Sequence, residues 1–488
     1  MLIEIKDLSI NYNTNEVVKN ISLQVDAGQW ILLSGPSGCG KSTLARAITG
    51  IIPHAINANI SGSIKINGKD IKHKALSELS QLIGIVFQNP GSQLFHLNVE
   101  DEISFGVRNL GYSENEVIRR TDWAIEAVGL RHLRESNPAE LSGGQKQCVA
   151  IAAVLAMRPS ILVLDEPSAS LDLPNTYKVM ETLKILRDQF GITIIMIEHR
   201  LSAFMQSVDR VLLMDDGEIV HDGNVEEIFS HNEVCSDLGI RRPADMPMTP
   251  WEKLIHPNGF SNSLEKPLLE LEQIFAGWNG NHVLKGISFS VYPGDFLAVV
   301  GANGVGKSTL AMVAAGMLKP RLGKVRFLNV RKPKPGLDVA LLFQNASDQL
   351  FTDTVNDEIS FGPLNYSCYN EKVHFSTLKN VDLDEIKNQR PTLLSVGQQQ
   401  RTALGACLSL RPRLIILDEP TLGQDWKHLQ QLMDFLKKLN QEGSAVLLIS
   451  HDYKIVHRYA NRLMLMENGR IKIMGKLQNK REEINDEV

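Results

Sequence analysis

Two short glycine-rich segments contain the residues whose types and spacing best suit phosphate binding. Residues 35–42 read GPSGCGKS and residues 301–308 read GANGVGKS, so both match the pattern G-x-x-x-x-G-K-[S/T]. The glycines let the backbone wrap closely around phosphate, successive N–H groups form an anion cradle, and the lysine adds a positive charge. The predicted nucleotide contacts are Gly35, Gly38, Gly40, Lys41, Ser42 and Thr43 in the first segment and Gly301, Gly304, Gly306, Lys307, Ser308 and Thr309 in the second.

Two carboxylate pairs follow short apolar runs. Asp165-Glu166 and Asp418-Glu419 each come after four apolar residues, the pattern of a buried strand that has just ended. An aspartate at that place can hold Mg²⁺ together with the serine of the phosphate loop. The adjacent glutamate can orient and polarise an attacking water, so Glu166 and Glu419 are the candidate catalytic carboxylates. The expected metal ligands are Ser42, Asp165, Ser308 and Asp418.

A third kind of phosphate contact is predicted at two helix starts. LSGGQ at residues 141–145 and LSVGQ at residues 394–398 occupy corresponding places in the sequence, and LSGGQ opens an apolar helical pattern. Ser142 can cap that helix. A helix N-terminus with free N–H groups is also a ready anion site. We therefore expect nucleotide contacts from Ser142, Gly144, Gln145, Ser395, Gly397 and Gln398.

These features occur twice because the chain repeats itself. FQN at residues 87–89 returns at 343–345, and ILVLDEP at 161–167 returns as LIILDEP at 414–420. A period this long indicates duplicated domains rather than a solenoid of short repeats. We predict a first nucleotide-binding domain at residues 1–229, a proline-broken linker at 230–266, a second domain at 267–480 and a charged tail at 481–488.

Each repeat reads as an α/β domain with a parallel-sheet core. The apolar runs 31–34, 161–164 and 192–197 have the composition of buried parallel strands, and the polar candidates follow them at the carboxyl ends, where open α/β sheets bind ligands. Asn67-Gly68 lies between alternating residues, which predicts a hairpin and hence an antiparallel β region. Residues 90–137 read as mostly helical, which predicts a helical subdomain.

Composition excludes some classes of function. The formal net charge of −5 gives no electrostatic case for a nucleic-acid binder. No apolar run approaches the roughly 20 residues that span a bilayer, so work at a membrane would require a partner. The five cysteines include no C-x-x-C pair, so we expect reduced thiols rather than a disulfide framework or a zinc site.

The ordered set of motifs resembles that of ABC ATPases. Besides the phosphate loop, LSGGQ and apolar-D-E-P, the set includes a glutamine at Gln88 or Gln344 and a histidine after the next strand, at His199 or His451. The resemblance implies that Tyr12 and Trp278 stack on adenine, and that each histidine links the γ-phosphate of ATP to the catalytic glutamate. It also implies that the halves pair head to tail, so that each LSGGQ-type segment serves the ATP held by the other half's phosphate loop.

The FQN segments resemble those of energy-coupling-factor (ECF) importers of vitamins. QLF and DEI follow both FQN segments, at 93–95 and 101–103 and again at 349–351 and 357–359. The resemblance implies an ATPase on the cytoplasmic face of the membrane, bound to integral membrane coupling and substrate-binding subunits. Arginine side chains of such partners are expected to form ion pairs with the carboxylates of Asp101, Glu102, Asp357 and Glu358.

Two alternatives stay open at this point. A soluble tandem ABC ATPase that acts on ribosomes or nucleic acid would share these motifs, although its long charged inter-domain helices have no counterpart in the predicted linker. A regulatory module without turnover is disfavoured because both glutamates and both histidines are present. The sites are also expected to differ, because Val396 stands where the first half has Gly143 and a β-branched residue restricts close approach of the backbone.

Overall fold

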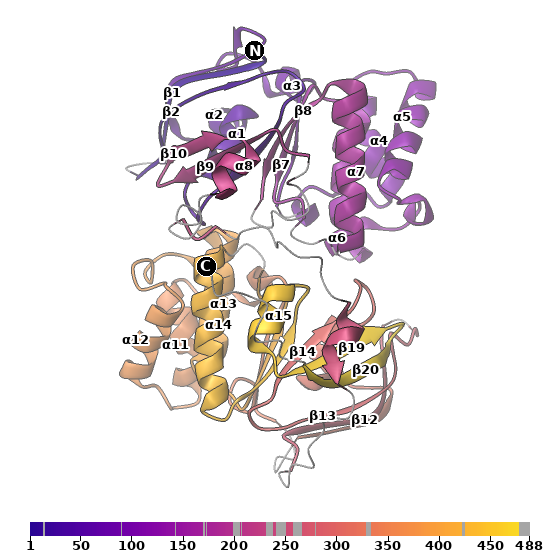
Figure 1. The fold of residues 1–488 in the computed structure, drawn as a ribbon, viewed down its shortest axis with the longest axis vertical. Coiled ribbons are helices and arrows are strands. Elements are labelled where there is room, and N and C mark those ends of the chain that lie inside the picture. The colour runs from indigo at the N-terminus through magenta and orange to yellow at the C-terminus, as the bar shows by residue number, and fades with distance from the viewer. Residues whose placement is uncertain are drawn as a thin grey trace. The chain divides into compact units, whose positions relative to one another are not determined.

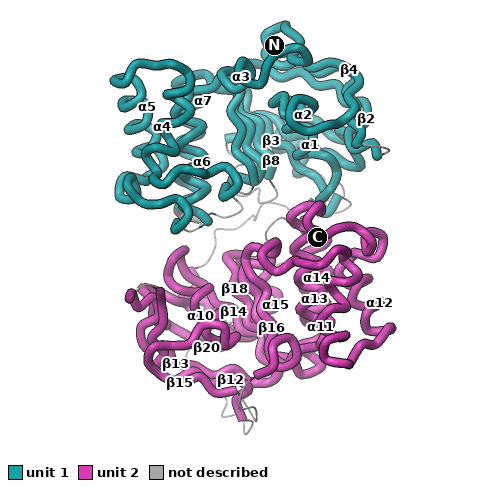
Figure 2. The backbone as a smooth tube through the Cα atoms, turned by 180° about the vertical axis from the view of Figure 1, so that it is seen from behind, with its two compact units in different colours: residues 1–245, 488 teal, residues 246–487 magenta. Residues whose placement is uncertain are grey.

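The chain divides into two compact units. The computed structural model describes residues 1–477 except 13–14, 89, 142, 169–170, 172, 199–204, 206, 231–237, 241–249, 257–265, 279, 328–332 and 422–424. The units are residues 1–245 and 246–487 (Figure 2). Both are α/β, each with a largely parallel sheet, an antiparallel sheet and a group of helices (Figure 1).

The main sheet of the first unit places its phosphate loop. Its strand order is β10-β9-β3-β8-β7-β6; β3, β6, β7, β8 and β9 run parallel to one another, and β10 is antiparallel to β9. All residues of β3, β7 and β8 are buried, as expected of parallel strands covered on both faces. The strands are β3 (Trp30–Ser34), β6 (Ile83–Val86), β7 (Ile161–Asp165), β8 (Thr193–Ile197), β9 (Arg210–Asp215) and β10 (Glu218–Gly223).

Two apolar cores cover the two faces of that sheet. Side chains alternate across a strand, so Trp30 and Leu32 join one core while Ile31 and Leu33 join the other. The second core is closed by an antiparallel sheet of order β2-β1-β4-β5, in which Asn67 and Gly68 form the predicted turn with positive φ. Its strands are β1 (Ile3–Tyr12), β2 (Asn15–Val25), β4 (Asn59–Ile66) and β5 (Lys69–Asp70).

The later helices of the first unit cover the other core and include the predicted helical subdomain, whereas its first three helices pack in the core closed by the antiparallel sheet. In Figure 1 the long α7 lies beside α4 and α5. The helices are α1 (Lys41–Ile48), α2 (Ile51–His54), α3 (Leu76–Leu79), α4 (Val99–Asn109), α5 (Glu114–Ala127), α6 (Gly143–Met157), α7 (Leu173–Phe190) and α8 (Val225–Ser230), with 3₁₀ turns η1 (Pro90–Ser92), η2 (Arg131–Leu133) and η3 (Pro138–Glu140).

The second unit repeats this architecture. Its main sheet has the order β11-β20-β19-β14-β18-β17-β16, so β19-β14-β18-β17-β16 reproduces β9-β3-β8-β7-β6, and a smaller sheet has the order β13-β12-β15. The strands are β11 (Ile255–His256), β12 (Leu269–Ala276), β13 (Leu284–Val291), β14 (Phe296–Val300), β15 (Leu322–Phe327), β16 (Val339–Leu342), β17 (Leu414–Asp418), β18 (Ala445–Ile449), β19 (Arg462–Glu467) and β20 (Arg470–Leu477).

The helices of the second unit also match their counterparts. They are α10 (Lys307–Ala314), α11 (Val355–Asn365), α12 (Glu371–Asn380), α13 (Val396–Leu408), α14 (Trp426–Gln441) and α15 (Tyr453–Tyr459), with 3₁₀ turns η5 (Ala346–Gln349) and η6 (Pro391–Leu393). No helix in the described part of the chain is both long and apolar enough to cross a membrane.

Part of the range predicted as an irregular linker is regular structure. Within residues 230–266, η4 (Trp251–Leu254) leads into β11 (Ile255–His256), which pairs antiparallel with the end of β20. Trp251 packs on Tyr453 with ring centroids 5.2 Å apart. This segment therefore covers an edge of the second unit's sheet, whereas most of the other residues of the predicted linker and the whole predicted tail lie outside the described residues.

Candidate nucleotide-binding sites

The phosphate loop of the first unit joins the buried strand β3 to α1. Gly35 has φ 150°, and a Cβ on it would lie 2.1 Å from the carbonyl oxygen of Met214, so only glycine fits there. Lys41 folds back over the loop, where its Nζ donates hydrogen bonds to the carbonyl oxygens of Gly35 (2.9 Å) and Pro36 (2.7 Å). The backbone cradle and the lysine predicted from sequence are thus brought together. Thr43 is buried, and Gly38 and Gly40 both have positive φ.

The loop of the second unit repeats this geometry between β14 and α10. Gly301 has φ 148°, and a Cβ on it would lie 2.4 Å from the carbonyl oxygen of Met466. The Nζ of Lys307 donates to the carbonyl oxygens of Gly301 (2.8 Å) and Ala302 (2.9 Å). Thr309 is buried and Ser308 is exposed, and Gly304 and Gly306 have positive φ.

A serine and an aspartate meet beside each loop. Ser42 Oγ donates a 3.2 Å hydrogen bond to Asp165 at the end of β7, and Ser308 hydrogen-bonds Asp418 at the end of β17. Burial, and then the charge of Glu166, raises the pKa of Asp165 to about 6, and burial raises the pKa of Asp418. Each pair offers hydroxyl and carboxylate oxygens, the hard donors that Mg²⁺ prefers.

The two candidate catalytic glutamates adopt the same unusual backbone conformation. Glu166 and Glu419 each have φ 50°, a left-handed conformation that is costly for a residue other than glycine and that clusters at functional sites. The N–H of Glu166 donates to Ile197 of β8, and the N–H of Glu419 donates to Ile449 of β18 (Ala445–Ile449). The neighbouring strand therefore fixes the backbone from which each carboxylate projects.

Each glutamate contacts one of its predicted partners. In the first unit, Gln88 Nε2 donates a 2.7 Å hydrogen bond to Glu166. In the second unit, His451 Nε2 lies 3.2 Å from Glu419 and 3.0 Å from Asn303 of the phosphate loop. Asn303 was not among the predicted contacts, and only its place inside the loop could have indicated it. Gln344 is exposed, and His199 lies outside the described residues.

The LSVGQ segment forms a helix start with a complete cap. Ser395 Oγ accepts from the N–H of Gln398 (3.3 Å), and Gln398 Oε1 accepts from the N–H of Ser395 (3.1 Å), which is a capping box. Val396 is the first helical residue and is exposed, and Gly397 is buried. In the first unit α6 begins at Gly143, Gly144 is buried and Gln145 is half-buried, whereas Ser142 lies outside the described residues.

The two predicted adenine-stacking residues differ in exposure. Tyr12 ends β1 and is half-buried against the core between the two sheets of the first unit. Trp278 follows β12, and 52% of its surface is exposed. Exposure of this kind leaves the Trp278 ring available for stacking on a ligand.

Two of the four carboxylates expected to face partner arginines are buried inside their own unit. Glu102 accepts from the N–H groups of Phe95 and His96, each at 2.8 Å, and Glu358 accepts from those of Phe351 (3.1 Å) and Thr352 (2.9 Å). The prediction for Glu102 and Glu358 is therefore wrong, because these carboxylates hold a loop through its backbone. Asp101 and Asp357 are exposed at the helix starts.

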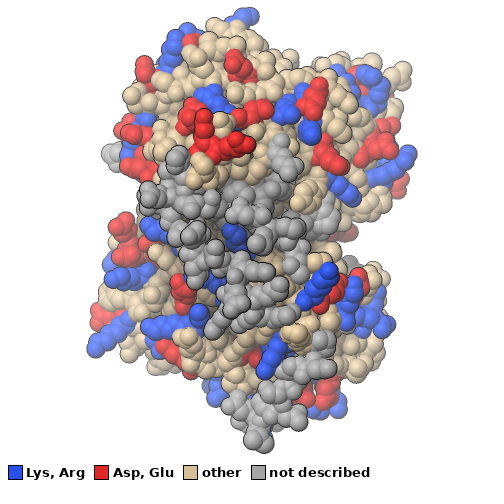
Figure 3. Space-filling view, viewed as in Figure 1, with Lys and Arg blue, Asp and Glu red and all other residues tan. Residues whose placement is uncertain are grey.

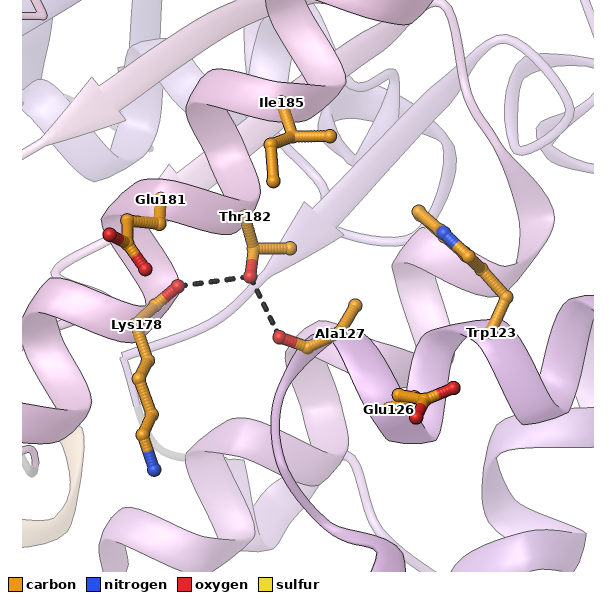
Figure 4. A pocket seen from close by; sticks show the side chains of 7 residues that line it. All are labelled: Trp123, Glu126, Ala127, Lys178, Glu181, Thr182 and Ile185. Carbon is orange, nitrogen blue, oxygen red and sulfur yellow. Dashed lines mark hydrogen bonds between the residues drawn. The ribbon is translucent and has the colours of Figure 1, made fainter.

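A cavity in the first unit lies apart from these candidate residues. It has a volume of about 270 Å³ and lies between α5 and α7 (Figure 4). The sticks show Trp123 and Ile185 beside charged side chains, and the hydroxyl of Thr182 donates a 2.8 Å hydrogen bond to Ala127. None of its lining residues belongs to the predicted nucleotide contacts; they are Trp123, Glu126, Ala127, Lys178, Glu181, Thr182 and Ile185.

Comparisons with known proteins agree with this geometry. The family model described as ABC transporter matches residues 18–169 and 284–422. A Methanosarcina acetivorans protein named as an ABC transporter ATP-binding protein is 35% identical over 97% of this chain and 84% of its own length. A Methanosarcina mazei protein with the same name is 36% identical over 96% of this chain and 88% of its own length.

A solved structure was also found. It is described as cbiO1 from Clostridium perfringens, part of the ABC transporter complex cbiONQ, and it is 35% identical with a TM-score of 0.43, covering 49% of this chain and 95% of its own. The family model and the full-length relatives each suffice to assign the family. The chain belongs to the ABC transporter family and is an ABC transporter ATPase with two ATP-binding domains.

Proposed function

We propose that this ATPase energises a membrane importer of the ECF type, for a vitamin, a vitamin precursor or a transition-metal ion. It would act at the cytoplasmic face of the membrane, bound to integral membrane coupling and substrate-binding subunits. The sequence support is the pair of FQN segments, each followed by QLF and DEI. The structural support is a surface that occurs once in each unit just beyond these segments.

In each unit this surface is one pair of exposed aromatic side chains, which we call the aromatic pair of that unit. In the first unit Phe95 contacts Phe105 edge to face, with ring centroids 5.0 Å apart, and in the second unit Phe351 contacts Phe361 at 4.8 Å. Phe95 is 65% exposed and Phe351 is 66% exposed, although large aromatic rings are normally covered. Exposed apolar groups gathered in this way indicate a protein-binding surface.

The loop that carries the first ring of each aromatic pair, Phe95 or Phe351, is held in a fixed shape. Gln93 accepts from the N–H of Phe87 (2.9 Å) and donates to Ile85 of β6 (3.2 Å), and the buried Glu102 binds the loop from the other side. Gln349 and Glu358 make the corresponding bonds in the second unit. A rigid loop loses little entropy on binding, which suits a docking surface.

An exposed aspartate carboxylate lies near each aromatic pair. Asp101 and Asp357 sit in the first turns of α4 and α11, the same helices that carry Phe105 and Phe361. An apolar surface with a neighbouring carboxylate is chemically suited to a short partner helix with apolar and arginine side chains. On the face shown in Figure 3, acidic and basic side chains are mixed over much of each unit, and a group of acidic side chains gathers on the first unit.

The proposed chemistry is hydrolysis of two ATP molecules. Water attacks the γ-phosphorus, the bond to the β–γ bridging oxygen breaks, and ADP leaves. Glu166 and Glu419 would orient the water, assisted by Gln88, Gln344, His199 and His451. Lys41 and Lys307 would neutralise charge on the phosphates.

The metal and the second half of each site belong to the same proposal. Mg²⁺ would be held by Ser42 and Asp165 or by Ser308 and Asp418, and it would neutralise charge on the β- and γ-phosphates. Each site would be completed by the other half. Ser395, Gly397 and Gln398 would serve the ATP at Lys41, and Ser142, Gly144 and Gln145 would serve the ATP at Lys307.

The test removes the aromatic pairs. The variant with Phe95→Ser, Phe105→Ser, Phe351→Ser and Phe361→Ser should retain ATP binding but lose co-purification with integral membrane proteins by about tenfold or more, as expected for truncated aromatic anchors. Phe375→Ser is the matched control, because Phe375 is 50% exposed on α12, outside the aromatic pairs. If the variant with all four substitutions recovers the membrane proteins at the wild-type yield, the aromatic pairs are not the docking surface.

A further inference from the structure

The segment 250–256, which lies within the range predicted as a linker, packs on α15 of the second unit. Trp251 contacts Tyr453, the first residue of that helix, with ring centroids 5.2 Å apart. Leu254 and Ile255 are buried and belong to the same apolar core as the inner face of α15. We call residues 250–256 the α15 strap.

A strand pairing fixes the other end of the α15 strap to the main sheet of the second unit. Ile255 lies opposite Leu477 and His256 lies opposite Lys476 in the antiparallel ladder of β11 and β20. Gly475 permits this close approach, because a Cβ on it would lie 2.2 Å from the carbonyl oxygen of His256. The strap is therefore anchored on β20 at one end and on α15 at the other.

The start of α15 determines where the backbone at His451 lies. Asp452 caps the helix by accepting from the N–H of Ile455 (3.0 Å), and only 4% of it is exposed. Its own N–H donates to the hydroxyl of Ser450 (3.0 Å). A helix of seven residues is unstable by itself in water, so packing against other elements must hold it in place. The strap supplies such packing at Tyr453, two residues beyond the histidine.

His451 makes the contacts that connect this helix start to the candidate site. Its Nε2 lies 3.2 Å from Glu419 and 3.0 Å from Asn303 of the glycine-rich loop. The backbone of Glu419 is fixed separately, because its N–H donates to Ile449 of β18. A shift in the first turn of α15 would therefore displace the histidine relative to the glutamate.

The first unit has no such strap in the part that the structure describes. Its main sheet ends at β10, which pairs antiparallel with β9 as β20 pairs with β19. In the second unit the sheet continues by one more strand, because β11 pairs with β20. The packing on α15 is thus a feature by which the two units differ.

We propose that Trp251 is a positioning residue for ATP hydrolysis in the second unit, and that it acts through Tyr453 on His451. This inference rests on the proposed role of His451 beside the γ-phosphate of ATP. By packing on the first residue of α15, the indole ring holds the histidine where it contacts Glu419 and the glycine-rich loop. Without the ring, the helix start moves and the histidine is less often in place when ATP is bound.

The first test separates turnover from ATP binding in the full chain. Trp251→Ala should lower kcat about fivefold or more and change KM for ATP less than about twofold, because the displaced group acts in the transition state. Trp251→Phe keeps an aromatic ring on Tyr453 and should restore most of the wild-type kcat. Wild-type kcat in Trp251→Ala, equal losses in the two variants, or a higher KM without a loss of kcat would overturn the proposal.

A matched control lies in the same strap. Glu252→Gln removes an ion pair with Lys472 in which both side chains are exposed, and exposed pairs of this kind contribute little to stability. Glu252→Gln should therefore leave kcat unchanged. A loss as large as that of Trp251→Ala would show that the ring on Tyr453 has no special role and would contradict the proposal.

Amide hydrogen exchange tests the position of the helix start directly. In Trp251→Ala the N–H of Ile455, which donates to Asp452, should exchange faster than in the wild-type chain. The N–H of Leu310 in α10, which donates to Gly306, should exchange at the wild-type rate. Equal acceleration at both amides would mean a general loss of structure and would contradict a local effect on α15.

Two further variants keep the inference testable and separate it from the proposed function. Tyr453→Ala removes the same contact from its other side, so it should lower kcat as Trp251→Ala does and covers the case in which that variant does not fold. The double variant should be no worse than the more damaging single variant, and additive losses would contradict the shared contact.

His451→Ala should lower kcat at least as far as Trp251→Ala. Wild-type kcat in His451→Ala would refute the proposed role of the histidine, and with it the reason for the strap. A loss of kcat in His451→Ala, together with wild-type kcat in both Trp251→Ala and Tyr453→Ala, would overturn the inference about the strap alone.

Discussion

At the scale of single residues, Asp165 combines burial with a neighbouring carboxylate. Only 4% of it is exposed, and its pKa of about 6 lies above the ordinary 3.8. The folded state therefore favours the protonated carboxyl, so this group makes folding less favourable as the pH rises from about 4 to 6. This is a stability cost located at a candidate metal ligand.

Asp165→Asn should consequently stabilise the nucleotide-free chain at pH 7. The removed penalty is of order 1–3 kcal/mol, which corresponds to a rise in Tm of a few degrees for a domain of this size. The same substitution should change Tm much less at pH 4, where the wild-type carboxyl is already protonated. Thermal unfolding at the two pH values measures this, and an unchanged or lower Tm at pH 7 would show that burial of Asp165 carries no such cost.

Val396 leads to a second prediction at this scale. It is the first residue of α13, is exposed, and stands where the first half has Gly143. If each LSGGQ-type segment serves the other half's ATP, the β-branched side chain hinders the site at Lys41, and the site at Lys307 is faster. Glu419→Gln should then reduce ATPase activity of the assembled complex more than Glu166→Gln. Equal losses, or the reverse order, would reject the asymmetry.

At the scale of elements, the loops after the FQN segments depend on one buried carboxylate each. Glu102 accepts two backbone N–H groups and Glu358 accepts two N–H groups and the hydroxyl of Thr352. Hydrogen bonds to a charged group contribute about 1.5–3 kcal/mol each, and the unpaired N–H groups add a further cost when the carboxylate is removed.

Glu102→Ala should therefore lower the Tm of the chain and increase amide exchange at Phe95 and His96. Asp101→Ala is the matched control on the same helix, because Asp101 is exposed. The N–H of Asp101 donates to Asn98. The Asp101 side chain accepts no hydrogen bond from the N–H groups of Phe95 or His96, so its removal should leave their exchange almost unchanged. If Asp101→Ala increased exchange at Phe95 as much as Glu102→Ala did, Glu102 would not be what holds the loop.

The same elements show what sequence can and cannot predict here. The strand–loop–helix geometry of the glycine-rich segments, the buried strands and the turn at Asn67 follow from local spacing and residue type, and the structure has all three. Glu102 and Asp101 are adjacent and chemically alike, and only helix orientation decides which one is buried. The exposure of Phe95 likewise depends on how the loop packs, although its recurrence as Phe351 in a duplicated segment was a usable signal.

Gly475 provides a test of the strand found inside the predicted linker. A Cβ on Gly475 would lie 2.2 Å from the carbonyl oxygen of His256, so Gly475→Ala should displace β11 from the edge of β20. The expected result is faster proteolysis within residues 250–256 and a change in Trp251 fluorescence, because Trp251 leaves Tyr453. Unchanged proteolysis in Gly475→Ala would contradict the pairing.

At the scale of the whole molecule, duplication of the domain duplicates the candidate machinery without making it identical. Both units have a glycine-rich loop of the same geometry, a glutamate with left-handed backbone conformation and an exposed aromatic pair. The LSGGQ-type segments differ, because Val396 stands where the first unit has Gly143. If the aromatic pairs dock partner subunits and the two ATP sites are unequal, as proposed, the chain is suited to driving a membrane complex that itself lacks exact symmetry.

The most direct test of this account is to identify what the chain binds in the cell. The tagged full-length protein would be purified in parallel from detergent-solubilised membranes and from the ribosome fraction, and the bound proteins identified by mass spectrometry. The account predicts integral membrane proteins in stoichiometric amounts in the first preparation and no enrichment in the second. Recovery of ribosomal proteins or nucleic acid, with no integral membrane protein bound, would contradict it.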